Sequence, residues 1–71
     1  MLNSVDAVVD ALGGTAAAAS LLGVGASAVS NWRSRRKIPE ENFLLVRDAL
    51  AAAGKDEPAP AVFGFKTEAR A

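Results

Sequence analysis

The sequence predicts a small all-α domain, and three observations lead to this prediction. Apolar residues recur at helical spacing in several stretches, and a glycine or a proline stands where each stretch ends. The chain of 71 residues is 51% hydrophobic, but 16 of its residues are alanines, which fill little volume. A core with so few large side chains favours short helices that pack closely within one domain.

The first helix is predicted from its cap and its stop. Asn3 and Ser4 can cap it, and Gly13 and Gly14 end it after about two turns. Its inner face is a set of apolar residues at helical spacing, namely Val5, Val8, Val9 and Leu12.

Two further helices are predicted in succession, separated by a short turn. The second is expected over residues 16–22, with Thr15 as its N-cap and Gly23 as its stop. Gly25 then occupies the N-cap position of a third helix, which runs from Ala26 to about Arg35.

A fourth helix is predicted to begin at Pro39, because proline suits the first position of a helix. Glu40 and Glu41 would lie in its first turn, where the helix dipole favours acids, and Gly54 ends it. Its apolar stripe would contain Phe43, Val46, Leu50 and Ala53, with Leu45 and Ala49 alongside.

This pattern divides the chain into a globular domain, residues 1–54, and a C-terminal tail, residues 55–71. Residues 55–60 have the composition of a linker. The apolar island Val62-Phe63-Gly64-Phe65 is open to several interpretations: a strand, a segment that docks onto its own domain, or a dimerisation or partner-binding motif. We expect a chain truncated after Gly54 to fold without the tail.

Composition excludes several classes of site. The chain has no Cys and no His, which removes disulfides, the usual zinc sites, and Cys or Ser–His nucleophiles. We also find no acid pair and no phosphate-cradling loop, so we expect no enzyme, cofactor or small-molecule substrate. No apolar run approaches the ~20 residues of a membrane span, and the N-terminus is acidic, unlike a signal peptide. A cytoplasmic protein is therefore expected.

The formal net charge is zero, but the charges are unevenly distributed. The first 32 residues contain two acids, Asp6 and Asp10, and no base. Arg33, Arg35, Arg36 and Lys37 then place four bases within five residues. One or two bases at a helix C-terminus are explained by the dipole, but four exceed what a cap needs. A polyanion would bind at this cluster.

The predicted third helix has two different faces. Ala28, Val29 and Trp32 share one face, which is expected to pack into the core. The opposite face carries small polar residues: Ser27, Ser30, Asn31 and Ser34. Such residues are poor helix formers, but they let a helix lie in a DNA major groove and bond to base edges. The alternative is an ordinary surface of low charge in a chain rich in alanine and serine.

Two short helices joined by a glycine-containing turn have the outline of a helix-turn-helix. The run from Ala19 to Trp32, Ala-Ser-Leu-Leu-Gly-Val-Gly-Ala-Ser-Ala-Val-Ser-Asn-Trp, with Ile38-Pro39 after it, resembles the Cro/YdaS type of phage-repressor helix-turn-helix family. The resemblance implies a compact four- to five-helix, lambda-repressor/Cro-like DNA-binding domain. Such domains are often dimers on palindromic operators and act in phage or prophage regulation. The family's base-facing positions match Ala26, Ser27, Ser30 and Asn31.

These observations lead to a functional expectation with one alternative. We expect a small transcriptional regulator, most simply a repressor, that binds double-stranded DNA as a homodimer. Bases would face Ala26, Ser27, Ser30, Asn31 and Ser34, and phosphates would bind Thr15, Arg33, Arg35, Arg36 and Lys37. The alternative is a protein-interaction module of the same fold, with Phe63 and Phe65 as anchors.

Overall fold

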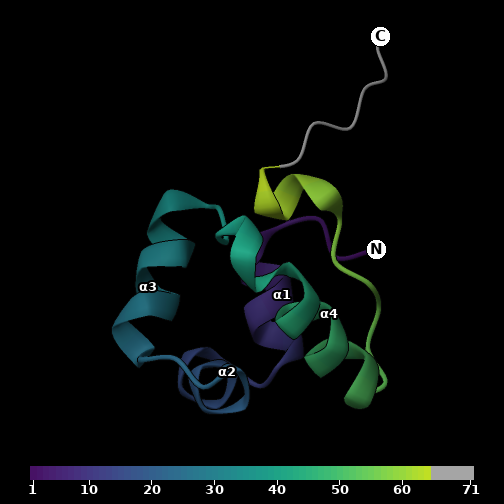
Figure 1. The fold of residues 1–71 in the computed structure, drawn as a ribbon, viewed down its shortest axis with the longest axis horizontal. Helices are drawn as coiled ribbons and strands as arrows, with labels where there is room; N and C mark the ends of the chain where they lie inside the picture. The colour runs from purple at the N-terminus through teal and green to yellow at the C-terminus, as the bar shows by residue number, and fades with distance from the viewer. Residues whose placement is uncertain (65–71) are drawn as a thin grey trace, which may run out of the picture.

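The computed structural model describes residues 1–64 and forms an all-α fold (Figure 1). Four α-helices are present, α1 (Val5–Ala11), α2 (Thr15–Leu22), α3 (Ala26–Arg35) and α4 (Phe43–Ala52), together with two 3₁₀ helices, η1 (Glu40–Asn42) and η2 (Pro60–Phe63). In the view of Figure 1, α1 lies between α3 and α4, α2 crosses one end, and η2 covers the other. No strand forms within the described residues. They contain an isolated β-bridge between Leu2 and Pro58.

The helix boundaries confirm most of the predicted stops and caps. The Ser4 hydroxyl accepts a hydrogen bond from the Ala7 amide (3.1 Å) and caps α1. Gly25 is the N-cap of α3, and Gly23 ends α2 in the left-handed conformation with φ +70°. A side chain is strained at that angle, so a glycine there allows the chain to turn directly into α3.

Two predicted helix starts are wrong. Helix α2 begins at Thr15 itself, and Gly14 occupies the N-cap position without a side-chain hydrogen bond. The fourth helix does not begin at Pro39, where the backbone is still extended with ψ 140°. The chain then makes the single 3₁₀ turn η1 before α4 begins. The amide of the preceding residue, Ile38, donates to the Val62 carbonyl (2.9 Å), which ties this extended segment to η2.

The predicted inner faces of the helices are buried, with exceptions on α4. Val8, Val9, Val29, Val46 and Leu50 are each at most 1% exposed. On α4, however, Leu45 is 46% exposed, and Ala53 at its end is also exposed. The stripe on α4 is therefore narrower than its sequence suggests.

The tail supplies part of the core. Phe63 is 0% exposed and Val62 is 3% exposed, although both lie beyond the predicted domain end at Gly54. The Phe63 ring packs edge-on against Phe43, with ring centroids 5.0 Å apart. A chain truncated after Gly54 would lack this large core side chain, so we now expect it to be less stable than the full chain. The last residue of the apolar island, Phe65, lies outside the described residues.

The N-terminal segment fixes the path of the tail. The Leu2 amide donates to the Glu57 carbonyl (2.8 Å), and the Leu2 carbonyl accepts from the Ala59 amide (2.8 Å). These backbone bonds hold residues 57–59 beside the start of the chain. Among the interpretations left open for the apolar island, the structure supports docking onto its own domain.

We predict that Phe63→Ala destabilises the full chain by about 3–5 kcal/mol, the cost of removing a buried aromatic side chain. Urea unfolding followed by circular dichroism measures this change. Leu21→Ala is the control, because Leu21 is 58% exposed and its loss leaves no cavity. Equal effects of the two substitutions would show that the tail is not part of the core.

Candidate nucleic-acid interface

The outer face of α3 presents all five predicted base-facing residues to solvent. Ala26, Ser27, Ser30, Asn31 and Ser34 are exposed. On the opposite face, Val29 is 0% exposed and Trp32 is 7% exposed. These two side chains fix the rotation of α3 about its axis, and this rotation points the small polar residues outward.

The turn before α3 fixes how the helix lies against α2. Only residues 23–25 separate the two helices. The Val24 amide donates to the Ala19 carbonyl (3.0 Å), and the half-buried Val24 side chain packs against the core. The Gly25 carbonyl accepts from the Ala28 and Val29 amides, which begins the hydrogen bonding of α3. Because α3 is held at its start and along its inner face, its outer face has a defined position.

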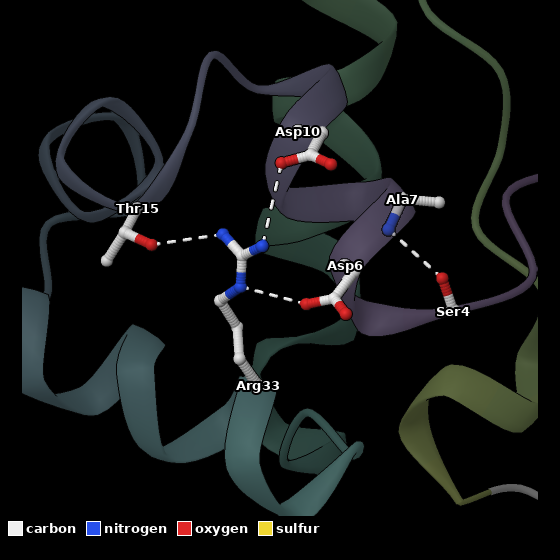
Figure 2. A network of polar contacts seen from close by, with 6 residues as sticks. All are labelled: Ser4, Asp6, Ala7, Asp10, Thr15 and Arg33. Carbon is white, nitrogen blue, oxygen red and sulfur yellow. Dashed lines mark hydrogen bonds and ion pairs between the residues drawn. The ribbon is translucent and has the colours of Figure 1, made fainter.

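Arg33 has partners that its sequence position did not suggest (Figure 2). Its Nε donates to Asp6 Oδ1 on α1 (2.8 Å), and its Nη2 lies 3.7 Å from Asp10 Oδ1. Its Nη1 donates to the Thr15 hydroxyl at the start of α2 (3.1 Å). The guanidinium group therefore connects α1, α2 and α3. Two carboxylates beside it offset its positive charge.

This network changes the roles of two predicted phosphate ligands. Arg33 is 31% exposed and directs its donors toward the protein. The Thr15 hydroxyl does not cap α2 but accepts from Arg33. Both residues thus take part in contacts between helices, which distinguishes Arg33 from the other three bases of the cluster.

The remaining bases are exposed at the end of α3. Arg35, Arg36 and Lys37 have no ion pair within residues 1–64. Arg36 is the C-cap residue and has a left-handed φ of +59°, the one positive φ outside glycine among the described residues. Glycine or asparagine normally occupies this position, since other side chains are strained there. The fold therefore retains an arginine at a backbone position that disfavours it.

Lys37 is positioned by the tail. A Cβ added at Gly64 would lie 2.5 Å from the Lys37 Cε, so the lysine stem crosses directly over this glycine. Gly64 has φ +80° and ends η2. Docking of η2 therefore brings Gly64 beside the Lys37 side chain.

Sequence reasoning missed the pairing of Arg33, although a signal was present. Asp6 and Asp10 are spaced four residues apart, which places both on one face of α1. They are the only charged residues before Arg33 in the sequence. Two acids on one helix face without a local base indicate a partner elsewhere in the fold.

The described residues contain no group of three Asp, Glu, His or Cys side chains that could hold a metal ion. No single helix within residues 1–64 is long and apolar enough to cross a membrane; α1 and α2 together meet that test of length and composition, with a bend of 79° between them.

We predict that Arg33→Gln lowers the free energy of unfolding by about 1–2 kcal/mol, because it removes contacts to two neighbouring helices. A double-mutant cycle with Asp6→Asn isolates the interaction free energy of the Asp6–Arg33 pair. It is measured by urea unfolding at low and at high salt. The coupling should shrink as salt rises. Lys55→Gln is the control, because Lys55 is an exposed base with no ion pair within residues 1–64. Additive effects of the two substitutions would rule out the Asp6–Arg33 interaction.

Comparisons of this chain with protein-family models, with curated protein sequences and with solved structures found no match.

Proposed function

We propose that this chain binds double-stranded DNA as a helix-turn-helix domain of the lambda-repressor/Cro type, with α3 in the major groove. It would act as a transcriptional regulator, most simply a repressor. The observation that carries the proposal is the surface of α3. It combines an exposed face of small polar residues with three bases at its end that have no ion pair within residues 1–64.

The outer face of α3 suits the major groove in size and chemistry. A helix of ten residues is about 15 Å long, and its width fits the groove of about 12 Å. Serine hydroxyls bond to several bases, and the Asn31 amide can pair with the N6 and N7 edge of adenine. Because these side chains are short, the backbone of α3 can approach the bases closely.

Arg35, Arg36 and Lys37 form the phosphate-binding set of this proposal, called here the basic end. They follow the polar face and have no acid partner within the described residues. Phosphate contacts of this type give affinity that is independent of sequence and falls as salt rises. Arg33 and Thr15 are assigned to holding α3 in place, which replaces the phosphate contacts expected from sequence.

A homodimer would present two copies of α3 about 34 Å apart, one turn of DNA. This needs a self-complementary surface. The tail is a poor candidate, because Val62 and Phe63 are buried within the chain. The same burial removes Phe63 as a partner-binding anchor. Helix α4 remains as the dimer surface of this proposal, since Leu44 and Leu45 are 57% and 46% exposed.

We predict that Arg36→Gly weakens duplex binding but stabilises the chain. The substitution removes one phosphate contact, which should lower the slope of log K against log salt by about one. It also removes the left-handed strain, which should raise the free energy of unfolding by about 1 kcal/mol. Fluorescence anisotropy with a labelled duplex measures the change in binding. Urea unfolding measures the change in stability.

Lys55→Gln is the control for this experiment, because it removes one exposed base that lies away from α3. It should leave the salt slope unchanged. An unchanged slope for Arg36→Gly would remove this residue from the basic end. Absence of duplex binding by the unaltered chain at low salt would overturn the proposed function as a whole.

We predict that Asn31→Ala costs about 1–3 kcal/mol on the preferred duplex and clearly less on random DNA. The preferred duplex is first identified by selection from a random pool. Asn3→Ala is the matched control, an exposed asparagine outside α3. Equal losses on both duplexes would mean that Asn31 does not read bases.

A further inference from the structure

A hollow of about 390 Å³ opens along one flank of α3. Its walls come from α3 and from the segment that follows it: Ala28, Asn31, Trp32, Arg35, Lys37 and Pro39. The volume is at the lower end of the range for small-molecule sites, about 300–1,000 Å³. The hollow lies beside the outer face of α3 and shares Asn31, Arg35 and Lys37 with the proposed DNA surface.

The chemistry of the walls is divided in two. Trp32, Ala28 and Pro39 provide apolar surface, whereas Arg35, Lys37 and Asn31 provide hydrogen-bond donors. No acid lines the hollow, and neither base has an ion-pair partner within residues 1–64. The lysine stem lies across Gly64.

Trp32 adds a further observation. It is 93% buried, since 7% of its surface is exposed, and its indole N–H has no hydrogen-bond partner within the described part of the chain. Trp32 also lines the hollow, so a ligand bound there would pack beside the indole.

We propose that this hollow binds a small aromatic carboxylate. The Arg35 guanidinium group suits a carboxylate, which it can bind through two parallel hydrogen bonds, and Lys37 adds a second positive charge. The ring packs on the indole and on Pro39. Because Asn31, Arg35 and Lys37 cannot contact the ligand and DNA at once, the ligand releases the chain from DNA. This release rests on the proposed function, whereas the binding of the carboxylate does not.

The test uses the full chain and sodium benzoate as the probe. The sequence contains one tryptophan, so the indole N–H of Trp32 gives a single signal in a ¹⁵N-correlation spectrum. Benzoate should shift this signal with saturation. Acetate, which has the charge without the ring, and benzyl alcohol, which has the ring without the charge, should shift it much less. Arg35→Gln should weaken benzoate binding about tenfold, and Lys55→Gln should not.

A second arm separates this proposal from the proposed function. Benzoate should weaken duplex binding more than acetate does at the same ionic strength. If the chain binds duplex DNA but benzoate moves the indole signal no more than acetate, the pocket is refuted and the DNA function stands. If the chain does not bind DNA, the indole titration still decides whether the hollow binds the carboxylate. Unchanged benzoate affinity in Arg35→Gln would also overturn the site.

Discussion

Burial of Phe63 is the interaction on which the rest of this fold depends. It is the largest fully buried side chain among the described residues, and it belongs to η2, outside the four α-helices. The helices are rich in alanine, and α2 contributes only Ala18, Ala19 and Leu22 to the core. Short helices with small side chains leave space between them, and protein interiors tolerate little empty volume. A segment from the end of the chain fills that space, so the domain includes its tail.

The same docking organises the proposed interface. The Ile38 amide bonds to the Val62 carbonyl, and the Lys37 stem crosses Gly64, so the segment after α3 is held by η2. At the other side of α3, Arg33 is held by α1 and α2. Helix α3 is thus fixed at its start by the turn, along its inner face by the core, and at its end by two separate contacts. A recognition surface benefits from this arrangement, because groups that are already ordered lose less entropy on binding.

Local signals in the sequence predicted local structure well. Ser4, Gly23 and Gly25 mark helix ends through their own backbone and side-chain chemistry, and the start of α3 was predicted from the two glycines. Non-local features were not predictable in this way. The burial of Phe63 depends on space left by distant helices, and an apolar island of four residues has too short a pattern to show its partner. The pairing of Arg33 with Asp6 spans 27 residues and exists only once α1 and α3 are packed.

The separation of the basic cluster into two roles has a physical consequence for binding. Had all four bases remained free, like charges would repel one another at the end of α3 and destabilise the fold. Asp6 and Asp10 offset the charge of Arg33, whose donors face the other helices. The positive charges of Arg35, Arg36 and Lys37 remain at the surface. The strained φ of +59° at Arg36 is consistent with this division, since a purely structural helix end would be better served by glycine. Arg33 and Phe63 hold the elements of the fold together, and the proposed binding is assigned to bases that have no ion pair within residues 1–64.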